Sequence, residues 1–113
     1  MIDFACKHFR IEDIVKCSLN LTKGDYAVLH LLSSQEKTLS SQDIAIKLGL
    51  DQSTVQRTLK KLHEKKLISR FQENLHGGGY QFTYRADKKL VRMTVKHIIK
   101  QWSDTVEKRI EEW

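Results

Sequence analysis

The sequence contains no proline, only two cysteines and no long apolar run. Cys6 and Cys17 are too few for a disulfide framework, which indicates a reducing compartment and predicts a cytoplasmic protein. No apolar stretch approaches the roughly 18 residues of a membrane-spanning helix, and the first residues, MIDFACKHF, lack the order of a signal peptide. With proline absent, the glycines mark the breaks in the chain, at Gly24, Gly49 and the run Gly77–Gly79.

Acidic side chains are scarce in the middle of the chain. Residues 37–100 carry 14 Lys and Arg against 5 Asp and Glu, whereas residues 1–36 and 101–113 are weakly acidic. The net charge of +6 of the 113-residue chain therefore comes from its middle. A surface for a polyanion such as DNA needs concentrated positive charge, so this asymmetry favours a nucleic-acid partner over solubility alone.

Two capping boxes locate helices in the first half. Thr22 with Asp25 predicts the start of a broadly apolar helix, and Ser40 with Asp43 repeats the signal for the next helix. A turn and a short strand at residues 37–39 are expected between them. An earlier helix is expected at about residues 11–18, where apolar residues recur at helical spacing.

The second half continues with a reversal, a hairpin and a long helix. Gly49 is expected at positive φ, and Asp51 is expected to cap a helix over about residues 52–65. Residues 67–74 and 79–85 predict two strands, and Asp87 can cap a helix that runs to the C-terminus. The fold predicted is mainly α with a small β-hairpin: a winged helix-turn-helix with a long C-terminal dimerisation helix. We expect residues 1–86 to form the DNA-binding domain and residues 87–113 the dimerisation helix.

The helix over residues 52–65 has two distinct faces at 3.6 residues per turn. Val55, Leu59 and Leu62 share one stripe and are expected in the core. The outward face suits the major groove of DNA, where Gln56 can pair with adenine and Arg57 with guanine. The remaining polar residues suit phosphates, which fix register without reading sequence: Ser53, Thr54, Lys60 and Lys61. Glu64, at the end of this face, limits the contact zone.

The tip of the hairpin is small and flexible in composition. His76, Gly77 and Gly78 could approach a phosphate backbone or minor groove, with Arg70 and Arg85 as flanking donors; a loop that contacts nothing is the alternative. Four aromatic residues flank this tip. They could stack on bases, but a half-buried strand face turned to the protein's own core is the interpretation we adopt for Phe71, Tyr80, Phe82 and Tyr84.

The C-terminal helix carries an apolar stripe that continues to its last residue. The stripe comprises two tryptophans and five aliphatic residues, which extend beyond what a small domain can cover. A second copy of the chain in a C2 dimer is the expected partner. For Val91 and Val95, packing on the core of their own subunit is the alternative. The expected dimer contacts are Val95, Ile98, Trp102, Val106, Ile110 and Trp113.

The segments STVQRTLKKLHEKKLISR and GGGYQFTYRA resemble the winged-helix domain of small archaeal TrmB-like and MarR-like transcriptional regulators. The likeness spans about residues 21–86, and the pattern S-T-V-x-R-x-L-x-x-L from Ser53 to Leu62 is its most specific part. The resemblance implies DNA contacts by Ser53, Thr54, Gln56 and Arg57. Neither the sugar-binding domain of TrmB-type regulators nor the ligand pocket of MarR-type proteins is matched, so the sequence identifies no small-molecule effector.

Catalytic and metal-binding patterns are absent. No Ser–His–acid grouping, phosphate-binding loop or paired carboxylates stand out, so we predict a protein that is not an enzyme and has no cofactor. Cys6, His8 and Cys17 match no zinc spacing, and Cys17 is interpreted as a small buried apolar residue. The sequence thus predicts a homodimeric regulator that binds double-stranded DNA, and the rival class is a winged-helix module that binds other proteins.

Overall fold

The computed structural model describes all 113 residues of the chain. Its contacts divide the chain into two compact units, residues 22–88 and residues 1–21 together with 89–113. The first 21 residues therefore group with the C-terminal segment, whereas the sequence led us to place them with the winged unit. The division into a DNA-binding domain at residues 1–86 and a dimerisation helix at residues 87–113 stays a prediction.

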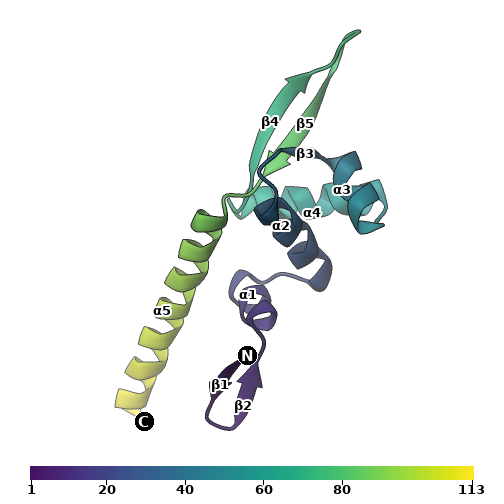
Figure 1. Cartoon of the computed structure of the whole chain (residues 1–113). Helices are drawn as coiled ribbons and strands as arrows, with labels where there is room; N and C mark the ends of the chain where they lie inside the picture. The colour runs from purple at the N-terminus through teal and green to yellow at the C-terminus, as the bar shows by residue number, and fades with distance from the viewer. The chain divides into compact units, whose positions relative to one another are not determined.

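Three helices build the core of the unit formed by residues 22–88 (Figure 1). They are α2 (Lys23–Ser34), α3 (Ser41–Leu48) and α4 (Gln52–Glu64). Their apolar faces meet because α4 contacts both α2 and α3. The largest fully buried side chains come from all three helices: Val28, Leu32, Ile44, Val55, Leu59 and Leu62. Removal of these branched side chains from water is the main stabilising contribution to this unit.

Both predicted capping boxes are confirmed. The backbone N–H of Asp25 donates to Thr22 Oγ1 at 3.1 Å, and the N–H of Thr22 donates to Asp25 Oδ2 at 3.0 Å. Ser40 and Asp43 form the same reciprocal pair at the start of α3. Each box satisfies donors that the first turn of a helix cannot bond internally, so these four residues determine where α2 and α3 begin.

The turn between α3 and α4 follows the predicted chemistry. Gly49 adopts φ 65°, a left-handed conformation that glycine reaches without a Cβ penalty. Asp51 then caps α4, with its side chain accepting from the N–H of Thr54. This short reversal places α3 and α4 in contact and completes the helix-turn-helix.

A three-stranded antiparallel sheet completes the unit and forms the wing. Strands β3 (Leu39–Ser40), β4 (Ser69–Asn74) and β5 (Tyr80–Arg85) lie in the order β3-β5-β4. Strand β3 thus lies slightly later than the strand expected at residues 37–39. The hairpin of β4 and β5 projects away from the helices of its unit (Figure 1). The predicted winged helix-turn-helix fold is confirmed.

The segment before residue 22 contains a hairpin that the sequence did not reveal. Strands β1 (Ile2–Phe4) and β2 (Lys7–Phe9) pair antiparallel, with Asp3 opposite His8, and α1 (Ile11–Leu19) follows. Within α1, Cys17 is exposed, so its interpretation as a buried residue is wrong.

The C-terminal helix α5 (Lys88–Glu112) is 25 residues long, as the apolar stripe predicted. No helix in the structure combines the length and apolar character needed to cross a bilayer.

Two isoleucines of α3 provide a matched test of the core. Ile44 is fully buried, whereas Ile46 on the same helix is 73% exposed. We expect Ile44→Ala to lower the free energy of unfolding by about 2–5 kcal/mol, because it leaves a cavity between three helices. Ile46→Ala should change it by less than about 0.5 kcal/mol. Urea unfolding followed by circular dichroism measures both; equal losses would show that the core lies elsewhere.

Candidate nucleic-acid interface

Helix α4 has one apolar face and one polar face, as predicted. Val55, Leu59 and Leu62 are at most 1% exposed, and they fasten one side of the helix to the core. The opposite side faces solvent and carries the exposed residues Ser53, Gln56, Arg57 and Lys60, with Thr54 half-buried beside them. The helix therefore presents a polar, basic surface on a rigid support, which is the arrangement that a groove-binding helix needs.

A chain of hydrogen bonds orders the start of this surface. Thr54 Oγ1 donates to Asp51 Oδ2 at 2.6 Å, and Arg57 Nη2 donates to Thr54 Oγ1 at 3.3 Å. Ser53 Oγ donates to the same carboxylate oxygen at 3.2 Å. The hydrogen bonds from Thr54 and Ser53 hold the pKa of Asp51 below its ordinary value. Arg57 is thus partly preorganised at the surface while its remaining donors stay available.

A buried carboxylate anchors α4 from the opposite side. Asp25, which is 6% exposed, accepts a hydrogen bond from Thr58 Oγ1 at 3.3 Å and pairs with Lys61 Nζ at 2.5 Å. Burial alone raises the pKa of Asp25, but hydrogen bonds from Lys61 and Thr22 and the charge of Lys61 outweigh burial and lower it. Asp25 therefore stays ionised and joins the first turn of α2 to the middle of α4.

This anchor changes the interpretation of one predicted DNA contact. The sequence grouped Lys61 with Lys60 as a phosphate contact, but the ammonium of Lys61 is engaged by Asp25 inside the unit. Lys60 has no carboxylate partner and is exposed. We therefore assign Lys61 chiefly to positioning α4, and its phosphate contact stays a prediction.

The wing tip is exposed and built from glycines. Gly77, Gly78 and Gly79 all have positive φ values, between 81° and 104°, which explains why the tip consists of three glycines. The N–H of Leu75 donates to Gly79 O at 3.1 Å, and the N–H of Gly78 donates to Leu75 O at 3.3 Å. The tip is therefore a closed turn rather than a loose loop, and the Gly78 amide is bonded internally rather than offered to a phosphate.

The aromatic residues of the wing do not all share one face. Register pairs Arg70 with Tyr84, Gln72 with Phe82 and Phe71 with Thr83, so Phe71 lies on the face opposite Phe82 and Tyr84. The buried residue of β5 is Thr83, at 6% exposure, while Phe71 and Tyr80 are about half exposed. The interpretation of all four aromatic residues as a core-facing set is therefore wrong.

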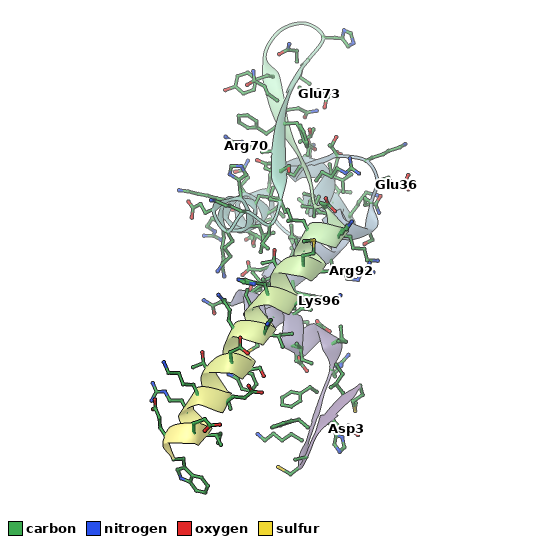
Figure 2. All side chains as sticks on the ribbon, turned by 90° about the vertical axis from the view of Figure 1, so that its left-hand side faces the viewer. Asp3, Glu36, Arg70, Glu73, Arg92 and Lys96 are labelled. Atoms are coloured by element: carbon green, nitrogen blue, oxygen red, sulfur yellow. The ribbon has the colours of Figure 1, made fainter.

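Register also separates the two arginines that flank the tip. Arg85 pairs with Ser69, which places it on the face of the hairpin away from Arg70. Figure 2 marks Arg70 on β4, near the base of the wing. We retain Arg70 in the candidate interface and remove Arg85 from it.

The expected dimer residues of α5 become more exposed toward the C-terminus. Val95 is buried at 9% exposure and Ile98 is half-buried. The later members of the stripe face solvent: Trp102 (62%), Val106 (37%), Ile110 (61%) and Trp113 (100%). On the same helix, the basic residues Arg92 and Lys96 lie one turn apart (Figure 2). The terminal half of α5 thus carries an uncovered apolar stripe.

Similarity to known proteins agrees with this fold. The sequence profile of the DnaD N-terminal domain matches residues 9–106. The chain belongs to this family. The region that matches the DnaD N-terminal domain extends from the end of the N-terminal hairpin through most of α5. It therefore includes the whole winged unit.

Individual proteins are also similar to this chain in sequence or in fold. A solved structure described as a possible transcriptional regulator from Methanosarcina mazei Go1 is 43% identical, with a TM-score of 0.90 over 100% of this chain and 96% of that chain. An uncharacterized protein of Methanocaldococcus jannaschii is 27% identical over 95% of this chain and 81% of its own length. The Staphylococcus aureus MepR–DNA complex shares the fold at 23% identity and a TM-score of 0.59, over 88% and 81% of the two chains. The predicted likeness to archaeal and MarR-like winged-helix regulators is confirmed.

Sequence reasoning missed the residues that position the interface. Asp25 and Thr58 carried signals only for a cap and for a helix, and nothing in the sequence placed them opposite each other. The pairing of Arg70 with Tyr84 likewise depends on hairpin register, which the sequence did not specify. The structure contains no cluster of three metal-ligating side chains.

The Asp25–Lys61 pair predicts a specific pH dependence. A double-mutant cycle of Asp25→Asn and Lys61→Met should give a coupling free energy on the order of 1–3 kcal/mol at pH 7. Because the pKa of folded Asp25 is lowered, this coupling is present above the unfolded value near 3.8 and is lost as the pH falls through the folded value. Urea unfolding of the four proteins between pH 7 and pH 2.5 measures it; a coupling that did not change with pH would exclude the ionised pair.

Proposed function

We propose that this DnaD N-terminal domain is a DNA-binding transcriptional regulator that acts as a homodimer on double-stranded DNA. The observation that carries the proposal is the outward face of α4. Its residues Gln56, Arg57 and Lys60 are exposed on a helix whose other face is fixed by the core and by Asp25. The excess of basic residues in the middle of the chain supplies the electrostatic attraction.

In this proposal the contacts divide by chemistry. Gln56 and Arg57 read base edges in the major groove, because amide and guanidinium groups can form paired hydrogen bonds with adenine and guanine. Phosphates are held by Ser53, Thr54 and Lys60, which fix the register of the helix on the duplex. The wing tip, with His76 and Gly77, approaches the neighbouring minor groove.

Known proteins add support at two levels. The Methanosarcina mazei protein that is 43% identical is described as a possible transcriptional regulator. MepR, which shares the fold, has been solved bound to DNA. Together they favour a regulator, while the operator-reading role of Arg57 rests on the geometry of α4 alone.

Dimerisation through α5 is part of the same proposal. Trp102, Ile110 and Trp113 expose large apolar surfaces that a monomer would leave in water at considerable cost. A second copy of the helix is self-complementary to such a stripe in a C2 arrangement. Two recognition helices one DNA turn apart would then read a pseudo-palindromic operator.

A winged-helix module that binds other proteins is the alternative function. It predicts little affinity for DNA, whereas phosphate contacts impose a steep negative slope of log affinity against log salt concentration. A salt titration of the full chain on random duplex DNA separates the two: a slope near zero with weak binding would favour the protein-binding module.

Arg57 and Lys60 should respond differently to substitution. On duplexes selected from a random library, Arg57→Ala should relax base preference at one position, at a cost of about 1–3 kcal/mol, because the hydrogen bonds to a base edge are removed. Lys60→Ala should weaken binding to all sequences about equally, since it removes a phosphate contact. Fluorescence anisotropy with matched and singly mismatched duplexes measures both; an Arg57→Ala variant with intact preference would refute the proposed docking of α4.

Two substitutions in α5 test the dimer. Ile110→Glu places a charge in the apolar stripe. It should raise the dissociation constant of the dimer at least tenfold, which corresponds to a loss of about 1.4 kcal/mol of binding free energy. Lys108→Glu also adds negative charge, but on another side of the helix, and should leave the dimer intact. Light scattering coupled to size exclusion measures the mass. Equal masses for both variants, or a dimer in a chain ending at Gln101, would show that the terminal stripe is not the contact.

A further inference from the structure

A cavity of about 360 Å³ lies between the outward face of α4 and the base of the wing. We call it the helix–wing cavity. Residues from three elements line it: Gln56, Leu59, Lys60, His63 and Glu64 from α4, Arg70 from β4 and Tyr84 from β5. Leu59 is 1% exposed and belongs to the core, so the cavity borders the centre of the winged unit.

The cavity has an excess of unpaired positive charge. No salt bridge joins Lys60 or Arg70 to a carboxylate. His63 and Gln56 add further nitrogen donors, and Glu64 is the only acidic residue in the lining. One carboxylate does not balance the two cations that share this cavity, and an anion between the cations would relieve their mutual repulsion.

Arg70 is held in place by its neighbours on the wing. Its guanidinium lies 4.4 Å from the centre of the Phe82 ring, a cation–π contact that restricts an otherwise mobile side chain. Its partner across the strand pair is Tyr84. Burial is the main influence that raises the pKa of Tyr84, so the hydroxyl stays protonated at neutral pH and can donate a hydrogen bond.

We infer that the helix–wing cavity is a phosphate-binding site that holds a backbone phosphodiester of the duplex, with Arg70 and Lys60 as the main ligands. This inference rests on the proposed function. If α4 occupies the major groove and the wing tip the minor groove, the sugar–phosphate strand that separates the two grooves must pass between them. The helix–wing cavity lies beside this path, between α4 and the base of the wing.

The volume of about 360 Å³ leaves room for a phosphate together with its neighbouring sugars. The donor set also suits phosphate, because a guanidinium forms paired hydrogen bonds to two phosphate oxygens. Glu64 opposes an anion here, which makes its substitution informative.

The two wing arginines provide the test. With the full chain and random duplex DNA, Arg70→Gln should reduce the magnitude of the salt slope by about 0.9 for each phosphate that the variant no longer binds. Arg85→Gln removes the same charge from the opposite face of the hairpin and should retain the wild-type slope. Glu64→Gln should raise affinity several-fold for every sequence, because it removes the one acidic group from the cavity. Circular dichroism confirms that each variant is folded.

The outcomes separate this inference from the proposed function. If wild-type protein shows no steep salt slope, the proposed function fails and the cavity assignment fails with it. The cavity assignment alone is overturned by either of two results with a wild-type protein that has a steep salt slope. Arg70→Gln could have the same salt slope as Arg85→Gln, or Glu64→Gln could leave the DNA affinity unchanged. A free phosphate ion is the other source of the same chemistry. Its binding is tested by titrating DNA-free protein with inorganic phosphate and following the NMR signals of His63. If Arg70→Gln abolishes this phosphate binding but leaves the salt slope of DNA binding unchanged, the cavity binds a free anion instead.

Discussion

The ion pair between Asp25 and Lys61 determines where the polar face of α4 lies. Asp25 closes the capping box of α2, and the same carboxylate accepts from Thr58 in the middle of α4 and pairs with Lys61 in its last turn. A rotation of α4 would break these bonds in a buried setting, where an unpaired carboxylate is costly. The apolar contacts of Val55 and Leu59 hold the helix against the core, but apolar contacts tolerate sliding more easily than directed bonds do. The carboxylate therefore supplies the rotational precision that a surface for base recognition needs.

This arrangement also determines which cations are available to a partner. Lys60 and Lys61 are adjacent in sequence, yet Lys60 has no carboxylate partner, whereas the half-buried Lys61 is paired with Asp25. Arg70 and Arg85 differ in another way, because they are both exposed but occupy opposite faces of the wing. A count of basic residues therefore overstates the charge that acts at the interface. The relevant quantity is the set of cations without a carboxylate partner on one surface, to which Lys60 and Arg70 belong.

Local signals in the sequence predicted the helices well, because the physics of a cap or a turn is contained in a few residues. Thr22 with Asp25 and Gly49 are examples: their side chains, or the lack of one, are sufficient to specify the conformation. That relation breaks down where a turn contains no such residue. The N-terminal hairpin turns at Ala5, at φ 49°, and the link after α4 turns at Lys66, at φ 62°. Neither residue type favours the left-handed region, so no sequence signal marks these turns.

The candidate site could be predicted from the sequence only where local patterns specify it. Helical periodicity places Gln56 and Arg57 outward whatever the rest of the chain does, so α4 could be assigned from sequence. The wing could not, since register decides which aromatic residues share a face, and a shift of one residue reverses the answer. The contribution of Asp25 depends on a contact across 36 residues, between Asp25 and Lys61, which no local pattern encodes.

The exposed half of α5 bears on the question of affinity. A single recognition helix with one wing offers few phosphate contacts, and each is weakened by salt at physiological concentrations. A dimer joined by Trp102 and Ile110 would make the second engagement intramolecular, so that its effective concentration, rather than new contacts, raises the affinity. The gain depends on how well the separation between the two winged units matches the spacing of the two half-sites on the DNA.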